Sequence, residues 1–271
     1  MCRLDPMGEC LMGPQLGLAR ARLRGIQAAR YDVVVVLDDD NWLSLDYLRV
    51  AWAAMQRDTG IAAVGGRLGT ALDGPAPSWF DRYAHCLAVG AQGLSRGPVE
   101  KGWLWGAGLV LRRAAVLDLL DRGWRPHLPG NRGTSRGSSD DLELCMALRS
   151  AGHSLGYEPA LTGEHFIRKE RLEWSYVLDL RRADGVASPI IDAYEAHLAR
   201  RALPPIRSAL MGTRGHLARA RVKLGPRSAH ASEGVDVAWN VSYLRGRLSG
   251  LTEERRWYED ALEGLASVFG N

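Results

Sequence analysis

The sequence lacks several features that would place it in a common class of protein. No run of about 18 uninterrupted apolar residues occurs, so a membrane-spanning helix is not expected. The N-terminus has no apolar signal core, and the four cysteines form no Cys-x-x-Cys pair, which is typical of reduced thiols in a cytoplasmic protein. Aromatic residues make up only 7% of the chain and the net charge is only +4, so no nucleic-acid surface is indicated.

The signatures of several enzyme classes are also missing. There is no Gly-x-Ser-x-Gly, no Walker phosphate loop and no His-Glu-x-x-His, and no cysteine has an evident catalytic partner. The glycine pairs Gly65-Gly66 and Gly106-x-Gly108 are too weak to predict dinucleotide binding. Candidate chemistry therefore rests on the carboxylates.

The order of predicted elements favours a three-layer α/β/α domain followed by helices, because strands alternate with helices over the first two thirds of the chain. We expect a disordered segment at 1–15, the α/β domain at 16–185 and a helical extension at 186–271. The individual elements expected in the domain are a helix at 16–29, a strand at 33–37, a helix at 43–57 capped by Ser44, strands at 61–66 and 103–111, a helix at 113–120, a long loop at 126–139, a helix at 140–152 and a strand at 153–157.

A strongly apolar segment is followed at once by three aspartates. Val33 to Val36 predict a strand buried on both faces, and Asp38, Asp39 and Asp40 come where it ends. Oxygen-rich clusters of this kind suit Mg²⁺ or Mn²⁺, which in turn suit phosphate-bearing substrates. Ligand sites of open α/β sheets also lie outside the carboxyl ends of strands. The alternative is an acidic turn that caps the helix beginning near Ser44.

Two other segments are candidates for the same site. Gly106 and Ala107, behind Trp105, are small enough to let a ligand approach the backbone, although core packing explains them equally well. Asp140 and Asp141 begin a helix after the long loop. The helix dipole stabilises a carboxylate at a helix N-terminus, so capping accounts for the presence of one of these aspartates. Asp141 is a candidate general base that would deprotonate a hydroxyl acceptor.

His165 and a basic segment complete the set of candidates. A single histidine is more often structural, but beside an acidic metal site its imidazole suits Mn²⁺ as a further ligand. Residues 200–227 contain eight Lys or Arg and no Asp or Glu. Their spacing predicts a basic amphipathic helix, which either contacts anionic lipid at the inner face of a membrane or packs on the main domain.

With these residues in view, the chain resembles family 2 glycosyltransferases of the GT-A fold over roughly residues 16–174. Five segments occur in the order of that family's motifs: Leu18–Ile26 before the acidic strand end, Val35–Leu43 as its Asp-x-Asp motif, Trp105–Gly108 followed by Arg112-Arg113, Asp140–Glu143 in place of its Glu-Asp-x-Glu, and Gly163–His165 as its late histidine.

The resemblance implies an inverting, single-displacement transfer from a nucleotide-sugar donor to a hydroxyl of a glycan, lipid or small-molecule acceptor. It assigns Asp38, Asp40 and His165 to a divalent cation, Mn²⁺ or Mg²⁺, which neutralises charge on the leaving diphosphate. It assigns Asp141 and Asp140 as catalytic residues, with Asp141 as the base. The residues that it implies in substrate binding are Asp39, Trp105, Gly106, Ala107, Arg132 and Arg136.

One departure from the family lies at the N-terminus. The family places a strand-helix-strand unit that binds the nucleotide base before its acidic motif, whereas 37 residues precede Asp38 here. The resemblance therefore implies that part of the nucleotide-binding half is missing and that a sheet edge is exposed, for a partner or a second copy to cover. Two alternatives stay open: a noncatalytic remnant that acts as a binding subunit, and a metal-dependent nucleotidyltransferase.

Overall fold

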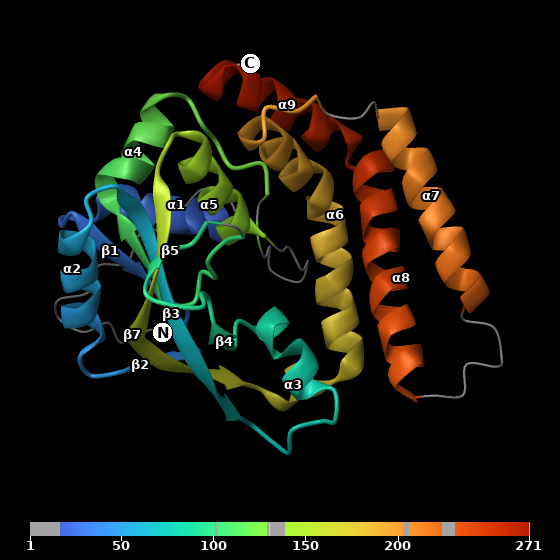
Figure 1. Cartoon of the computed structure of the whole chain (residues 1–271), viewed down its shortest axis with the longest axis horizontal. Helices are drawn as coiled ribbons and strands as arrows, with labels where there is room; N and C mark the ends of the chain where they lie inside the picture. The colour runs from blue at the N-terminus through green and yellow to red at the C-terminus, as the bar shows by residue number, and fades with distance from the viewer. Residues whose placement is uncertain are drawn as a thin grey trace.

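A computed structural model describes residues 17–100, 102–128, 130, 139–202, 206–223 and 231–270. Within these residues, helices cover both faces of a seven-stranded sheet, and long helices from the second half of the chain lie to one side (Figure 1). The strands are β1 Val33–Val36, β2 Asn41–Leu43, β3 Ile61–Leu72, β4 Gly90–Ala91, β5 Gly97–Pro98, β6 Leu109–Arg112 and β7 Ser154–Ile167. The helices are α1 Leu18–Ala28, α2 Tyr47–Arg57, α3 Phe80–Tyr83, η1 Ala84–Leu87, α4 Arg113–Asp121, α5 Asp140–Ser150, η2 Lys169–Leu172, α6 Trp174–Leu198, α7 Ile206–Lys223, α8 Ala231–Thr252 and α9 Arg255–Phe269.

The sheet is mixed, with the order β1-β6-β3-β7-β2. Of the strand pairs in the described residues, β3 with β7 is parallel and the others are antiparallel. The short strands β4 and β5 pair with β3 and β7 outside this path. Antiparallel strands therefore flank the parallel β3–β7 pair on both sides.

The three-layer α/β arrangement is confirmed by the way the strands divide their side chains. In β6, Val110 packs with α2 on one face, whereas Leu109 and Leu111 pack with α1, α4 and α5 on the other. Both cores are apolar and closely packed, so the period of two along each strand fixes which side chains face which helices. The helices therefore hold the strand ends, and the loops that follow them, in fixed positions.

The strand of four valines differs from its prediction in burial. Val33 and Val35 face the α2 layer and Val34 and Val36 the opposite layer, as expected for a strand covered on both faces. All four side chains are nevertheless only half buried. The reason is that β1 ends the strand order and pairs with β6 alone among the described strands.

The segment after the aspartates is the next correction. Asn41–Leu43 forms strand β2, paired with Gly163–His165 of β7, and the helix begins only at Tyr47. Ser44 is therefore not the N-cap: its backbone N–H donates to the carbonyl of Thr162 at 3.0 Å, which continues the strand pairing. The pairing with β7 outweighs the local preference of Ser44 for a helix start.

Two other strand boundaries were also wrong. The segment predicted to be a strand at 103–111 is regular only from Leu109, and residues 103–108 form a loop. Gly108 in that loop has φ +72°, and an added Cβ would lie 2.7 Å from the hydroxyl of Tyr47. The strand predicted at 153–157 instead runs from Ser154 to Ile167, which places His165 on a regular strand.

The C-terminal helices pack on the α/β domain through α6. The apolar cluster that contains Leu109 and Leu111 of β6 also includes Ile190 and Tyr194 of α6 and Leu265 of α9. Helix α6 runs without interruption across residue 185, the boundary expected from the sequence, and α7 confirms a helix within the basic segment. No helix in the described part of the chain has the length and apolarity needed to cross a bilayer.

Glycines let α6 and α8 approach closely, and their replacement is the first test. A Cβ at Gly246 would lie 1.9 Å from the carbonyl oxygen of Arg182, so Gly246→Ala forces the two helices apart. We expect a loss of about 1–3 kcal/mol in the free energy of unfolding, measured in urea. Gly25→Ala in α1, where nothing lies within 4 Å, is the matched control and should gain up to about 1 kcal/mol from helix propensity. Equal effects at the two positions would refute the close contact.

Candidate active site

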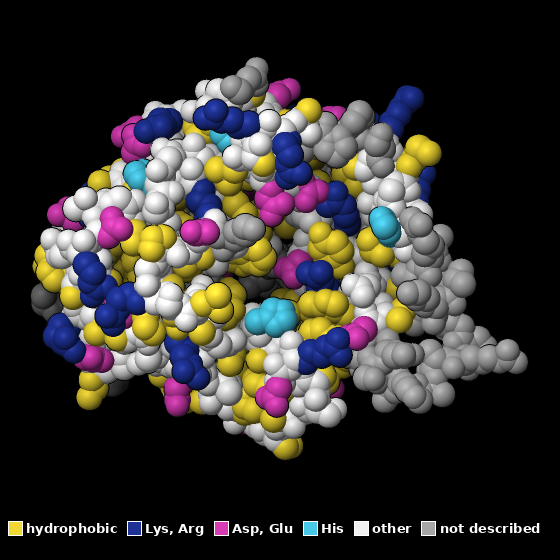
Figure 2. Space-filling model, viewed as in Figure 1, with side chains coloured by type: hydrophobic (Ala, Val, Ile, Leu, Met, Phe, Trp, Pro, Cys, Tyr) yellow, Lys and Arg dark blue, Asp and Glu magenta, His cyan; other side chains and the backbone are white. Residues whose placement is uncertain are grey.

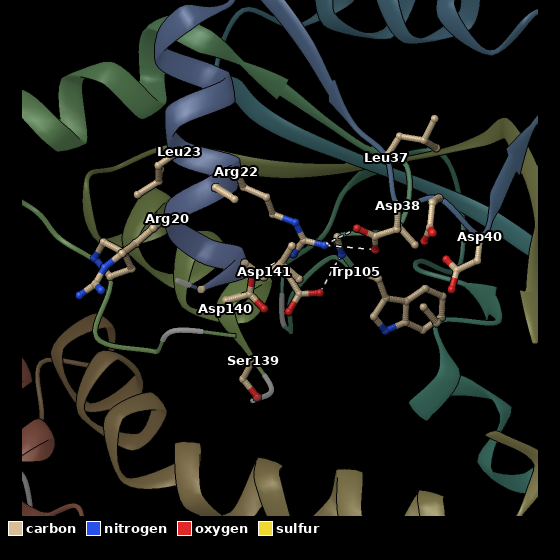
Figure 3. Close-up of a pocket in the computed structure, with 18 of the residues that line it drawn as sticks. Arg20, Arg22, Leu23, Leu37, Asp38, Asp40, Trp105, Ser139, Asp140 and Asp141 are labelled. Carbon is tan, nitrogen blue, oxygen red and sulfur yellow. Dashed lines mark hydrogen bonds and ion pairs between the residues drawn. The ribbon is translucent and has the colours of Figure 1, made fainter. Parts of the chain in front are cut away.

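The acidic residues from two distant parts of the sequence line one cavity. Asp38–Asp40 and Asp140–Asp141 both border a cleft of about 1180 Å³, together with side chains from α1 and α6. The surface is hollowed near the middle of the face shown in Figure 2. In Figure 3, Asp38 and Asp40 lie on one side of the pocket and Asp140 and Asp141 project toward them from α5.

The three consecutive aspartates form a turn between β1 and β2. The backbone N–H of Asn41 donates to the carbonyl of Asp38, and the N–H of Asp38 donates back to the side-chain oxygen of Asn41 at 3.3 Å. The β2–β7 register then places Asn41 opposite His165, and the carbonyl of Asp40 accepts the N–H of Phe166. The turn is thus fixed at both ends, which brings Asp40 beside His165.

Arg22 joins the two acidic segments. This residue of α1 donates to both oxygens of Asp38, at 3.0 and 3.2 Å, and to Asp140 at 2.9 Å. Its side chain is 14% exposed. Burial alone would lower the pKa of Arg22, but the carboxylates of Asp140 and Asp38 outweigh it and raise the pKa. The cation therefore holds two carboxylates that would otherwise repel each other.

Asp140 is the more perturbed of the two helix aspartates. Burial raises the pKa of its carboxyl to about 6, and the neighbouring Asp141 adds to the rise while Arg22 opposes it. Desolvation disfavours the charged carboxylate, so the proton stays on at higher pH than usual.

Asp141 is held by backbone groups. One carboxylate oxygen accepts the N–H of Gly106 at 2.7 Å, and the other accepts the N–H of Leu142 at 2.8 Å in the first turn of α5. These two bonds fix the plane of the carboxylate, with the loop at 103–108 on one side and the helix on the other. A carboxylate held in this way can accept a proton from a bound hydroxyl without first reorienting.

Asp40 and His165 form a second buried polar group. Asp40 is 8% exposed and His165 is 7% exposed, and His165 Nε2 lies 3.4 Å from Asp40 Oδ1. Because His165 Nδ1 lies 2.7 Å from the carbonyl of Leu87, which can only accept, Nδ1 carries the proton and Nε2 is an acceptor. Arg171 from η2 lies 3.0 Å from Asp40 and 3.3 Å from His165 Nε2, so its guanidinium supplies positive charge to both.

The side chains of Asp40 and His165 suit a divalent cation, whereas Asp38, the third predicted ligand, is paired with another residue. A histidine that donates one ring nitrogen to a carbonyl and presents the other beside a carboxylate is the arrangement common among metal-binding histidines. Asp38, however, faces Arg22. Within the described residues, no group of three or more His, Cys, Asp or Glu is arranged to hold a metal ion. The assignment of Asp38, Asp40 and His165 as ligands therefore stays a prediction.

Those expected substrate-binding residues that the structure describes also lie at this cavity. Asp39, Trp105, Gly106 and Ala107 all line it. Gly106 is there for a steric reason, since an added Cβ would lie 2.7 Å from the guanidinium of Arg22. Arg132 and Arg136, on the predicted loop, lie outside the described residues, and the substrate contacts of the whole set stay predictions.

Sequence reasoning missed two cationic residues, Arg22 and Arg171. A signal for the first was present: Arg22 lies three residues after Ala19 and four before Ile26, both on the apolar stripe of α1, where an arginine needs an acidic partner. No comparable signal exists for Arg171, because a short 3₁₀ turn brings it to Asp40.

Comparison with known protein families matches residues 5–109 to Glycosyl transferase family 2. The match covers the turn Asp38–Asp40 and the loop with Trp105, whereas Asp140, Asp141 and His165 lie beyond it. The resemblance inferred from the motifs is thereby confirmed for this part of the chain, and the match agrees with the GT-A-like class expected for the fold.

The search of curated proteins found no match. Among solved structures, the chain is similar to GalNAc-T7, crystallised with UDP, GalNAc and Mn²⁺, at 14% sequence identity and a TM-score of 0.43. The similarity covers 89% of this chain and 43% of that one, so the chain spans less than half the length of the protein it resembles.

Proposed function

We propose that this protein transfers a glycosyl group from a nucleotide-sugar donor to a hydroxyl acceptor, with inversion at the anomeric carbon. The observation that carries the proposal is the convergence of Asp38–Asp40 and Asp140–Asp141, about a hundred residues apart, on one cavity beside a segment that matches a glycosyltransferase family. Inverting transfer needs a base on the acceptor side and positive charge near the leaving diphosphate. The cavity offers candidates for both.

Asp141 is the proposed base. It takes the proton of the acceptor hydroxyl as the oxygen attacks the anomeric carbon and the bond to the diphosphate breaks. Its two backbone hydrogen bonds keep the carboxylate in one orientation during this step. Trp105 and Ala107 line the space beside it, where we place the transferred sugar.

Positive charge at the opposite side of the cavity would balance the departing diphosphate. Arg171 is already present there, between Asp40 and His165. A divalent cation, Mn²⁺ or Mg²⁺, would be held by Asp40 and His165 and would supply further neutralisation of the leaving group when bound. Since Arg171 and the cation would compete for Asp40, we infer that the two are alternative partners of that carboxylate.

One observation favours a second candidate, a noncatalytic binding subunit. Asp38 and Asp40 are each paired with an arginine, Arg22 and Arg171, so the carboxylates are neutralised within the chain. In a protein that no longer binds a nucleotide sugar, such pairs would serve only to stabilise the fold.

Calorimetry with UDP and Mn²⁺ separates the two candidates. We expect binding that depends on the metal and that Asp40→Ala weakens about tenfold or more. Arg171→Ala, which removes the competing cation, should instead strengthen Mn²⁺ binding measured without UDP. Asp46→Ala is the matched control, because this carboxylate is half exposed at the start of α2 and should leave both affinities unchanged. Absence of UDP binding by the unaltered protein, with or without metal, would support the noncatalytic subunit.

A further inference from the structure

The cavity that holds the aspartates has a basic end. Arg20, Arg24 and Gln27 of α1 line it, as does Arg125 after α4. The spacing of four and three residues places the α1 side chains on one face of that helix. In Figure 3, Arg20 lies at the opposite side of the pocket from Asp40, with Asp140 and Asp141 between them. Charge therefore changes sign along one continuous space.

The basic end is available to a ligand. In the described part of the chain, neither Arg20 nor Arg24 forms an ion pair, in contrast to Arg22 on the adjoining face of the same helix. Arg125 is oriented by the carbonyls of Leu120 and Trp124, which accept from one terminal nitrogen at 2.9 and 2.6 Å. Among the residues that the structure describes, no partner accepts from its other N–H groups, which can therefore donate to an anion. Guanidinium groups bind phosphate through paired hydrogen bonds and remain charged at any physiological pH.

The position of this basic end relative to Asp141 assigns it to one substrate. Asp40, His165 and Arg171 occupy the end of the cavity proposed for the diphosphate of the donor. A hydroxyl that approaches Asp141 from the other side would belong to a molecule that extends toward Arg20, Arg24 and Arg125. An anionic group on that molecule is attracted to this end and repelled by the aspartates, which fixes its direction in the cavity.

We propose that the acceptor is a phosphate ester, whose phosphate is bound by Arg20, Arg24 and Arg125. This inference rests on the proposed glycosyl transfer, because it takes Asp141 as the base. The phosphate comes either from a soluble sugar or polyol phosphate or from the headgroup of a lipid. Both present an anionic phosphoryl group, with non-bridging oxygens that accept hydrogen bonds, to the three arginines.

The test measures phosphate binding without the donor. Glycerol 1-phosphate is titrated calorimetrically against the full chain and against the Arg20→Glu/Arg24→Glu double variant, with glycerol as the uncharged probe. We expect the phosphate to bind, glycerol not to bind, and the variant to lose about tenfold or more in affinity. Affinity for UDP with Mn²⁺ should stay within about twofold in the variant, since its binding end is elsewhere. Arg30→Glu/Arg256→Glu, an equal charge change at exposed positions outside the cavity, is the control.

Vesicles distinguish the two sources of phosphate. A lipid acceptor is supported if the protein sediments more strongly with phosphatidylcholine vesicles that contain phosphatidylglycerol, whose headgroup carries free hydroxyls, than with phosphatidylcholine alone, and if Arg20→Glu/Arg24→Glu loses this difference. A soluble acceptor is supported if the protein binds glycerol 1-phosphate but neither kind of vesicle. Equal losses in the two double variants, or no phosphate binding by the unaltered chain, overturn the inference. Loss of UDP binding in Arg20→Glu/Arg24→Glu also overturns it, because the arginines would then hold the donor. If UDP fails to bind the unaltered chain but glycerol 1-phosphate binds, the proposed transfer fails and the anion site remains.

Discussion

Replacing Asp141 by asparagine is expected to lower kcat by about 10²–10⁴-fold and to leave donor binding nearly unchanged. Asparagine keeps the shape of the side chain and can still accept the N–H of Gly106 or Leu142 through its one oxygen. It cannot take a proton from the acceptor hydroxyl. Because the loss affects only the transition state, kcat falls while the affinity for UDP, measured by calorimetry, stays the same.

Asp140→Asn is the matched control for this variant. Asp140 is the adjacent residue, has the same charge and is paired with Arg22, so its replacement removes a carboxylate without removing the proposed base. We expect a fall in kcat of less than about tenfold, since asparagine still accepts a hydrogen bond from Arg22. Screening nucleotide sugars for hydrolysis first identifies the donor for both measurements. A larger loss in Asp140→Asn than in Asp141→Asn would move the role of base to Asp140.

The local chemistry of the site could be predicted from the sequence because it follows from short-range patterns. A run of valines predicted β1, and the apolar stripe Ala19, Leu23 and Ile26 predicted α1. Strand ends of α/β sheets collect functional side chains, so Asp38–Asp40 and Asp140–Asp141 were expected to meet, and they line one cavity. These inferences needed only residues that are neighbours in sequence and one rule about fold class.

The rest depends on contacts between distant segments, which no local pattern contains. Asn41–Leu43 forms a strand because it pairs with Gly163–His165. The local sequence around Leu43 and Ser44 predicts the start of a helix instead. In the loop at Gly106, the backbone passes against the guanidinium of Arg22, 84 residues earlier. The partner of each carboxylate is likewise non-local: Asp38 pairs with Arg22 and Asp40 with Arg171, 131 residues later.

These pairings change how the acidic cluster should be understood. Three adjacent carboxylates, Asp38, Asp39 and Asp40, repel one another unless something cationic holds them. In the structure two arginines supply positive charge to the first and last of them, and the middle one is exposed. The fold therefore does not need a metal ion to tolerate the cluster. A cation proposed at Asp40 would therefore act on the substrate or on Arg171.

Replacing Arg22 by methionine is expected to lower the free energy of unfolding by about 3–5 kcal/mol at neutral pH. Methionine keeps most of the side-chain volume but leaves Asp140, 9% exposed, and Asp38, 37% exposed, without the cation between them. Removing one partner of a largely buried ion pair costs more than the pair itself contributes, because the remaining charge stays desolvated. Arg49→Met is the control: its pair with Asp46 is exposed on α2 and should change stability by less than about 1 kcal/mol.

The dependence of this loss on pH separates lost charge from lost packing. Burial already raises the pKa of Asp140 to about 6, and without Arg22 that pKa rises further. A carboxyl with a raised folded pKa binds its proton more tightly in the folded state, so its contribution to stability falls as the pH rises from the unfolded value near 4 through the folded pKa. Urea unfolding should therefore show the penalty of Arg22→Met at its largest near pH ~7 and reduced near pH ~4, where Asp140 is neutral in the folded state and about half neutral in the unfolded state. An equal penalty at the two pH values would mean that Arg22 stabilises the site through its aliphatic stem, and the carboxylates would then not depend on its charge.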